Sequence, residues 1–547
     1  MTSIKISKKE LEKTLGKKFK DEYLMDRISM MGTPVDKIDS DEIEIEVFPN
    51  RPDLLSFQGI VRAFSTFIGL RKGLSEYKVE KSGEKVIIDK SLKNIRPFTA
   101  CAIVKGIHFD DEKIKEIIQV QEKIHLTFGR NRKKLAIGVY PYEKIKPPIR
   151  FIAKDPDEIK FRPLEYPKAI TGRQILSMHP AGKEYAYLLD CCDRYPIFID
   201  SENKILSMPP IINSHDVGKI TEMTRDVFIE CSGFDFDVLE KCLNMIVTAL
   251  ADMGGKIYSM ELDYPDKKRV TPDLSPKKMS IDYDYINKRL GLNLKNDEMN
   301  KLLLKMGFGI SGGNALIPAY RTDIMHQVDL AEDAAIAYGY ENFKEEIPNV
   351  STIGSESKSS VLKNVVADIL AGLGMIELST YHLINKNIQT KMMDCSCNPV
   401  EIENSLSREY DTLRSWLVPC VMEVLKNNKH IEYPQKIFDI GAVFGIDNSQ
   451  ETGVKEGLRL AAAVCSEDSD YTEIRQILDY LLRMLDLKYE IKEYEHNSFV
   501  PGRCGNIIVN GKSIGMLGEI HPKVLSNFGL EYPVAAMEID LDKVLEL

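Results

Sequence analysis

Residues 296–317 read NDEMNKLLLKMGFGISGGNALI. Asn296 is suited to cap a helix over 297–306, and the glycines that follow favour a helix end and a tight turn before a strand. With its flanking segments, this stretch gives residues 279–345 the order strand, helix, helix, hairpin, helix. That order is typical of a small, helix-rich, winged-helix-like module.

Two nucleotide-binding patterns are excluded by their context. Gly307-Phe-Gly-Ile-Ser-Gly312 matches G-x-G-x-x-G, but a helix precedes it and a strand follows, the reverse of what a dinucleotide-binding loop needs. Gly511-Lys-Ser513 resembles the end of a phosphate-binding loop, yet Gly505 upstream has the wrong spacing. Asn510-Gly511 lies between two alternating apolar runs and predicts a type I′ hairpin instead.

Before and after residues 279–345, changes in composition and in the pattern of apolar residues predict further domains. The whole chain is therefore expected to be a multidomain α+β protein. A chain of 547 residues has room for three to four domains. The last part alternates helix and strand, which favours an antiparallel sheet with packed helices. The expected domains are residues 1–95, 96–268, 270–345 and 350–547.

Composition narrows the class of protein. The net charge is −10, so nucleic-acid binding must rest on local basic patches. Hydrophobic residues make up 43% and charged residues 29%, as in ordinary folded domains. No signal peptide and no apolar run long enough to span a membrane is present, so a cytoplasmic location without membrane contact is expected. The cysteines include no Cys-x-x-Cys pair and are expected to be buried, reduced thiols.

One acidic cluster stands out between residues 323 and 333, a segment without Lys or Arg. On a helix, Asp329 shares a face with Glu332 and Asp333, and Asp323 lies just before them. Carboxylates on one face repel one another unless a cation compensates, and Mg²⁺ is suited to such a set. The alternative is that Asp323 caps the helix and the other acids favour its first turns.

Two polar segments are further candidates for binding. The run Gly129-Arg-Asn-Arg-Lys-Lys134 is suited to contact a phosphate backbone through Arg130, Arg132, Lys133 and Lys134, or is simply a solvated face. Asn213, Ser214 and His215 follow an apolar entry and form either a polar corner of a pocket or a capping turn.

With these segments in view, the chain resembles the archaeal and eukaryotic β subunits of phenylalanine–tRNA ligase over essentially its whole length. Bacterial β subunits are much longer, which supports the archaeal form. The motifs that carry the resemblance are Phe48-Pro-Asn-Arg-Pro-Asp-Leu-Leu55, Phe128-Gly-Arg-Asn-Arg-Lys-Lys134, Pro209-Pro-Ile-Ile-Asn-Ser214, Tyr320-Arg-Thr-Asp323 with Asp329-Leu-Ala-Glu-Asp333, Pro501-Gly-Arg503 and Gly518-Glu-Ile-His-Pro522.

The resemblance implies an N-terminal domain, a B3/B4 domain of the tRNA-editing type, a B5 domain, and a C-terminal domain with the class II synthetase fold but no catalytic residues. The sequence agrees on the last point, because no Gly-x-Gly-x-x-Arg stretch follows residue 350, and Gly372-Leu-Gly-Met-Ile-Glu377 has Glu in place of Arg. An acid there would repel the phosphates of ATP.

Activation of phenylalanine with ATP is then implied to belong to an α subunit, in an (αβ)₂ heterotetramer that acts on tRNA(Phe). The family assigns the matching carboxylates Asp323, Asp329, Glu332 and Asp333 to a Mg²⁺ shared with the α subunit. The B3/B4 domain is implied to hydrolyse Tyr-tRNA(Phe), with Asn213, Ser214 and His215 as candidates for its pocket. A pocket that hydrogen-bonds the phenol can discriminate tyrosine from phenylalanine strongly.

Three rival functions remain open at this point. The first is a free-standing aminoacyl-tRNA deacylase built on residues 96–268. The second is a structural tRNA-binding scaffold. The third is a Mg²⁺-dependent phosphohydrolase that uses the acidic segment 323–333.

Overall fold

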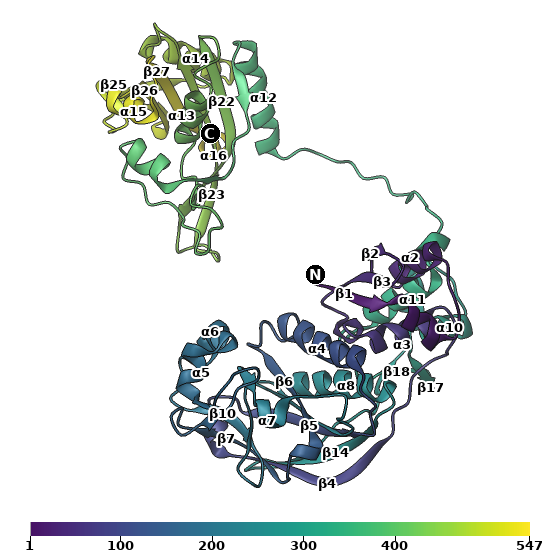
Figure 1. Cartoon of the computed structure of the whole chain (residues 1–547). Coiled ribbons are helices and arrows are strands. Elements are labelled where there is room, and N and C mark those ends of the chain that lie inside the picture. The colour runs from purple at the N-terminus through teal and green to yellow at the C-terminus, as the bar shows by residue number, and fades with distance from the viewer. Residues whose placement is uncertain (1) are drawn as a thin grey trace. The chain divides into compact units, whose positions relative to one another are not determined.

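The chain divides into two compact units, Met1–Ile347 and Pro348–Leu547. The computed structural model describes residues 2–547 (Figure 1). The division falls next to the Ser- and Gly-containing stretch before helix α12 (Lys358–Gly372), where the sequence predicts the start of the last domain. Each unit has cores of its own.

The first elements form a three-stranded antiparallel sheet with helices. The sheet has the order β1-β3-β2. As its capping pattern predicts, Ser7 accepts a hydrogen bond from the Glu10 amide at the start of α1. The elements are β1 (Thr2–Ser7), α1 (Lys8–Leu15), α2 (Asp21–Met30), β2 (Val35–Ile38), β3 (Glu42–Val47), the 3₁₀ turn η1 (Pro52–Leu54) and α3 (Phe57–Phe67).

A large mixed sheet follows, and one of its strands, β4, lies before residue 95 in the sequence. Strand β4 (Val79–Ile88) pairs in parallel with both β7 and β14, so the expected boundary near residue 95 falls after a strand of the next sheet. The path through the sheet is β12-β11-β10-β7-β4-β14-β5-β13-β6, with β15 paired to β14. Its other strands are β5 (Phe98–Lys105), β6 (Leu135–Pro141), β7 (Ile149–Lys154), β10 (Tyr195–Ile199), β11 (Ile205–Met208), β12 (Ile212–Asn213), β13 (Val227–Gly233), β14 (Lys256–Asp263) and β15 (Lys268–Thr271).

Side chains alternate between the two faces of this sheet, and each face has its own core. Helices α4 (Asp111–Leu126) and α8 (Phe236–Asp252) cover one face, where Val104, Ile137 and Ile229 are buried (Figure 1). The opposite face buries the aromatic side chains Tyr140, Phe151, Phe198 and Phe228 together with the short helix α7 (His215–Gly218). Smaller elements on the connections are α5 (Gly172–Met178), α6 (Pro180–Tyr185), β8 (Lys160–Phe161) and β9 (Ile170–Thr171).

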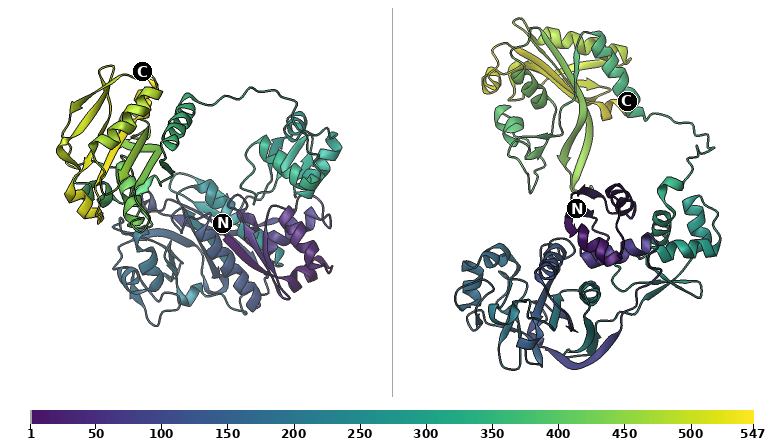
Figure 2. Two further views of the ribbon diagram at one scale, coloured as in Figure 1. Left: turned by 90° about the horizontal axis from the view of Figure 1, so that it is seen from above. Right: turned by 45° about the vertical axis from the view of Figure 1, so that its right-hand side comes forward.

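Residues 277–338 form the module predicted from its order of elements. It consists of β16 (Lys277–Ser280), α9 (Tyr283–Leu290), α10 (Asn296–Lys305), β17 (Gly309–Ser311), β18 (Asn314–Ile317) and α11 (Gln327–Tyr338). The module packs beside α3, since the Gly73 amide donates to the Leu304 carbonyl and Phe67 joins the core of the module (Figure 2). Helix α11 starts at Gln327 with His326 as its cap, so Asp323 does not cap it.

The second unit is a seven-stranded sheet with helices on both faces. Its order is β19-β22-β23-β27-β26-β25-β24, and all pairs except β19–β22 are antiparallel. Asn510 and Gly511 both adopt positive φ, as the predicted type I′ hairpin requires. The strands are β19 (Ile376–Leu378), β22 (Gln435–Ile446), β23 (Val454–Cys465), β24 (Tyr489–Glu493), β25 (Phe499–Val509), β26 (Lys512–Ile520) and β27 (Val534–Asp540).

Two separate cores lie on the two faces of this sheet. One contains α12, α14 (Tyr471–Met484) and α16 (Leu541–Leu545). The other contains α13 (Val418–Asn427) and α15 (Pro522–Phe528). Among residues 2–547, no helix has the length and apolar character needed to cross a membrane.

Candidate functional site

The acidic segment lines a cavity of the first unit that measures about 830 Å³. The cavity brings together three motifs that are far apart in the sequence. Asn50 and Arg51 come from the loop after β3, Phe128 comes from the start of the basic loop, and the remaining wall is made by residues around 322–325 and by helix α11. All four predicted carboxylates, Asp323, Asp329, Glu332 and Asp333, line this wall.

A buried arginine lies between two of these carboxylates. Arg321 Nη2 is 2.6 Å from Asp323 Oδ2 and 2.8 Å from Asp333 Oδ2, and Nε donates to Asp323 Oδ1 at 2.8 Å. Burial works against ionisation of Asp323, but the hydrogen bonds and charge of Arg321 lower its pKa below the usual value. Burial raises the pKa of Asp333, and Arg321 offsets only part of that effect. Arg321 stands in the motif Tyr320-Arg-Thr-Asp323, but its pairing with Asp333 is not predicted by the sequence, because the two residues are twelve positions apart.

The other two carboxylates are less constrained. Asp329 Oδ2 accepts hydrogen bonds from the amides of Met325 and His326, both at 2.7 Å. These bonds satisfy two backbone amides just before α11. Glu332 lies at the surface of the same helix. Partial burial and the charges of Asp333, Asp329 and Asp323 raise its pKa. A cation near Glu332 would relieve that repulsion.

The carboxylates do not by themselves form a closed metal site. Both oxygens of Asp323 are committed to Arg321. Across residues 2–547 no three His, Cys, Asp or Glu side chains converge as metal ligands. The four predicted residues therefore share a cavity but do not fit a four-carboxylate site. Mg²⁺ commonly binds through only one or two carboxylates with water as the remaining ligands, and Asp329 and Glu332 fit that mode.

The basic loop divides into inward and outward side chains. Arg132 donates to the Ile211 carbonyl at 2.9 Å, pairs with Glu122 at 3.0 Å and lies 4.4 Å above the ring of Tyr185. It therefore anchors the loop. Arg130 and Lys133 are exposed, while Lys134 is half-buried against Phe128. Of the four predicted phosphate contacts, only Arg130 and Lys133 are free to meet a nucleic acid directly.

The predicted polar corner belongs to a larger buried cluster. Asn213 and His215 are half-buried and Ser214 is buried. The hydroxyl of Tyr140 lies 2.8 Å from Ser207 Oγ, 3.0 Å from Glu230 Oε1 and 3.4 Å from Asn213 Oδ1. Strands β6 and β11 lie near opposite ends of the sheet, so this contact shows that the sheet curls and encloses the cluster.

Glu230 is the residue that sequence reasoning missed. It is 2% exposed, and burial raises the pKa of its carboxyl to about 7. Within residues 2–547 its Oε2 has no hydrogen-bond partner, and the charge of the nearby Arg96 counters only part of the effect of burial. Arg96, also buried, donates to the hydroxyl and carbonyl oxygens of Ser232 nearby. The only available signal was a lone acid in the apolar strand β13.

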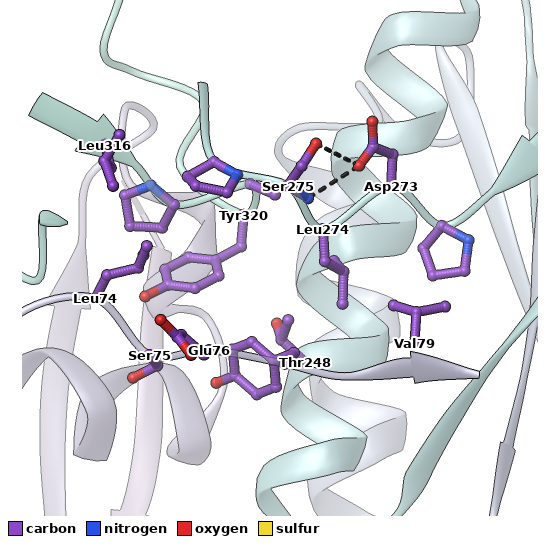
Figure 3. Close-up of a pocket in the computed structure, with 15 residues that line it drawn as sticks. Leu74, Ser75, Glu76, Val79, Thr248, Asp273, Leu274, Ser275, Leu316 and Tyr320 are labelled. Carbon is purple, nitrogen blue, oxygen red and sulfur yellow. Dashed lines mark hydrogen bonds between the residues drawn. The ribbon is translucent and has the colours of Figure 1, made fainter. Parts of the chain in front are cut away.

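A second cavity, of about 470 Å³, contains none of the predicted site residues (Figure 3). It lies among connecting segments and the middle of α8, and the Tyr320 side chain lines it. The carboxylate of Asp273 accepts hydrogen bonds from the amide and hydroxyl of Ser275. Its Oδ1 therefore stabilises the turn. The guanidinium carbon of Arg62 lies 4.1 Å from the centroid of the Tyr320 ring.

In the second unit, a buried arginine has a structural role. Arg414 is 1% exposed, donates to the Ala442 carbonyl and the Thr380 hydroxyl at 2.7 Å each, and lies 3.4 Å from Asp439. It is therefore not free to hold a phosphate. The expectation that the cysteines are buried is wrong for Cys191, which is exposed, and for Cys192, Cys395 and Cys397, which are only half-buried.

Comparison with known proteins gives consistent matches along the whole chain. Residues 279–340 match the family model described as tRNA synthetase B5 domain, and residues 344–541 match the one described as phenylalanyl tRNA synthetase beta chain CLM domain. The phenylalanine–tRNA ligase beta subunit of Pyrococcus horikoshii is 42% identical over 99% of both chains. That of Methanothrix thermoacetophila is 37% identical over 99% of this chain and all of the relative.

A solved structure covers the first unit. The crystal structure of an N-terminal fragment of the phenylalanyl-tRNA synthetase beta subunit from Pyrococcus horikoshii matches 62% of this chain and 99% of its own length. The TM-score is 0.59 at 42% sequence identity. The six motifs quoted from the sequence thus identified the correct relatives.

Proposed function

The chain belongs to the family of phenylalanine–tRNA ligase β subunits, and from this premise we propose that it supports the ATP-dependent attachment of phenylalanine to tRNA(Phe) by a separate α subunit. The observation that carries the proposal is the full-length identity of about 42% to β subunits. In this proposal the two chains assemble as an (αβ)₂ heterotetramer in the cytoplasm.

This chain is proposed to lack the aminoacylation site, within a C-terminal domain of the class II type. Two features support that part. Glu377 follows the glycines of residues 372–374 at the position where an ATP-binding site needs a cation. Arg414 is held internally by Asp439 and by backbone and hydroxyl oxygens. ATP is then a substrate of the complex and is bound by the α subunit.

Mg²⁺ is proposed to bind at the acidic cavity. Asp329 and Glu332 are the residues of this chain that would contribute oxygens, with water or the α subunit supplying the others. Asp323 and Asp333, the other two predicted ligands, would join them only if Arg321 released them. When bound, the cation offsets the mutual repulsion of carboxylates on one helix face, so it would tie the cavity to a partner rather than take part in bond cleavage here.

We also propose that residues 96–268 bind tyrosine attached to tRNA(Phe) and remove it by hydrolysis. The support is the polar set of Ser207, Asn213 and Glu230. Their side-chain oxygens surround the phenol hydroxyl of this chain's own Tyr140. Such a set strongly prefers a ligand with a hydroxyl over one without it. Ser214 and His215, predicted for the same pocket, follow Asn213 directly, and His215 Nδ1 is buried without a partner among residues 2–547.

The test compares phenylalanine attachment to tRNA(Phe) by this chain alone, by the α subunit alone and by their mixture at equal concentrations. Activity in the mixture only is expected. Activity of this chain alone, or no activity in the mixture, would contradict the proposal. The mass of the complex, measured by light scattering, tests the (αβ)₂ stoichiometry independently.

The rival functions are separated by three further measurements. Hydrolysis of Tyr-tRNA(Phe) by this chain without an α subunit would favour the free-standing deacylase. Unchanged charging by the α subunit when this chain is left out would favour a structural scaffold. Release of phosphate by the isolated chain with Mg²⁺ would favour the phosphohydrolase.

A further inference from the structure

The buried carboxyl of Glu230 is unusual for a core position. Its Oε1 accepts a hydrogen bond from the Tyr140 hydroxyl, and burial of a carboxyl is costly, with the charge of Arg96 offsetting only part of that cost. Buried polar groups in folded proteins are normally paired, and those that are not deserve a reason. Here Glu230 Oε2 has no partner within residues 2–547. The polar cluster around Glu230 therefore contains at least one hydrogen-bond acceptor, Glu230 Oε2, that has no donor among the described residues.

The group that fills this cluster is the side chain of Tyr140. Its ring is fully buried and stacks on Phe228 at 5.8 Å between centroids. Its hydroxyl reaches Ser207, Glu230 and Asn213 at once. The phenolic proton can be donated to the carboxylate, and the serine hydroxyl can donate to the phenolic oxygen. These are the interactions that the phenol of a bound tyrosine would make.

The backbone is built to accommodate this ring. Tyr140 and Gly138 project from the same face of β6, because residues two apart on a strand share a face. Glu230 is registered opposite Gly138 on β13. A Cβ atom on Gly138 would overlap the hydroxyl of Tyr140. The missing side chain of Gly138 therefore leaves the space beside Glu230 that the phenol of Tyr140 occupies.

We infer that Tyr140 occupies the phenol-binding pocket of residues 96–268 as an internal competitor and limits the entry of a tyrosyl group. This inference rests on the proposed clearance of Tyr-tRNA(Phe) and deepens it. A tyrosyl ligand must displace Tyr140 to reach Glu230 and Ser207. Tyr140 is thus a specificity-determining residue, and clearance by the natural sequence is slow.

The direct test measures binding of p-cresol, the side chain of tyrosine as a free molecule, by calorimetry with the full-length chain. Tyr140→Val removes the ring and introduces a β-branched residue that suits a strand. It is expected to bind p-cresol at least about tenfold more tightly than toluene, which lacks the hydroxyl and leaves the polar set unpaired. The natural chain and Tyr140→Phe, which keep the ring in place, are expected to bind neither.

A matched control is Phe151→Val, which opens space in the same apolar core. Phe151 is fully buried and stacks on Phe198, and no hydrogen bond of Ser207, Asn213 or Glu230 involves it. It should show no preference for p-cresol over toluene. Equal binding of p-cresol by the natural chain and Tyr140→Val, or no preference over toluene in Tyr140→Val, would overturn the inference.

Loss of a buried aromatic side chain can destabilise the fold, so a second readout is needed. A ligand that binds only the folded state stabilises it. Should Tyr140→Val unfold readily, p-cresol is expected to raise its midpoint of thermal unfolding and that of Tyr140→Leu. The absence of a rise in both variants would count against the inference.

Clearance of Tyr-tRNA(Phe) by the complex with the α subunit completes the test. Tyr140→Val is expected to clear at least about tenfold faster than the natural chain if the ring competes with the substrate. Selective p-cresol binding without faster clearance would support the occupied pocket and count against the proposed hydrolysis. Faster clearance without p-cresol binding would overturn the role of the ring as a competitor.

Discussion

Arg321 Nη2 lies 2.8 Å from Asp333 Oδ2, and both side chains are buried. This pair fixes helix α11 to the loop that carries Asp323, because the same nitrogen also contacts Asp323 Oδ2 at 2.6 Å. The acidic cavity is therefore held together by a cation from the chain itself. That arrangement separates the residues that organise the site from those still free to bind a ligand.

Replacing Arg321 with Met is expected to destabilise the module around α11 by about 3–5 kcal/mol, because two buried carboxylates lose their cation. The measurement is hydrogen–deuterium exchange of residues 320–340. Trp416, the single tryptophan, lies in the second unit and its fluorescence should report unchanged unfolding there. Arg173→Ala breaks an exposed pair with Asp157 and should cost under about 1 kcal/mol. Equal effects of the two substitutions would contradict this account.

Glu332→Gln is expected to abolish stabilisation of the first unit by Mg²⁺. In the natural chain, millimolar Mg²⁺ should raise the midpoint of thermal unfolding, since a cation offsets the repulsion among the carboxylates at α11. The variant loses that repulsion together with a ligand. Glu158→Gln, at an exposed position outside the cavity, is the control. If the natural chain, Glu332→Gln and Glu158→Gln all respond to Mg²⁺ identically, the proposal that Mg²⁺ binds at Glu332 is wrong.

Glu230→Gln is expected to change the pH dependence of stability. The pKa of Glu230 is about 7 in the folded chain and near 4.5 when it is exposed, so the folded state binds the proton more tightly. Stability is therefore lost as the pH rises from 4.5 through 7, by roughly 3 kcal/mol. The neutral glutamine escapes this loss. Urea unfolding by pulse proteolysis at pH 5 and pH 8 measures the difference, and parallel pH profiles for both proteins would refute it.

Gly138→Ala is expected to destabilise the natural chain by about 1–3 kcal/mol, because the added methyl group overlaps the Tyr140 hydroxyl in a closed core. In a Tyr140→Val background the same change should cost little, since the ring is gone. The double-mutant cycle, measured by urea unfolding, gives the coupling between the two positions. Gly445→Ala, on an open part of β22, is the control. Additive effects would show that the two residues do not compete for space.

Arg130→Ala and Lys133→Ala are each expected to weaken tRNA binding and to reduce the slope of log affinity against log salt by about 1. Both side chains are exposed. Arg132→Ala should instead loosen the loop, because Arg132 is bound to Glu122 and to the Ile211 carbonyl. Lys256→Ala, exposed on another strand, controls for net charge. Unchanged salt dependence in the first two variants would exclude this loop as a tRNA contact.

Much of the local structure was predictable because it depends on neighbours a few residues apart. Ser7 caps the helix that follows it, and Asn510-Gly511 forms the turn of its hairpin. Local patterns do not decide between several residues that could cap one helix. Both Asp53 and Ser56 precede α3, but Asp53 pairs with Arg51, and Ser56 caps the helix.

The sequence by itself determined the family, the order of elements and the acidic segment, because these are carried by contiguous motifs. Only the tertiary structure decided how the site residues meet. Tyr140 and Ser207 are 67 positions apart and touch because the sheet curls, while Arg321 occupies the space between carboxylates that sequence spacing alone assigned to a metal. Burial then sets the charge of Glu230, since desolvation depends on everything packed around it and not on its neighbours in the chain.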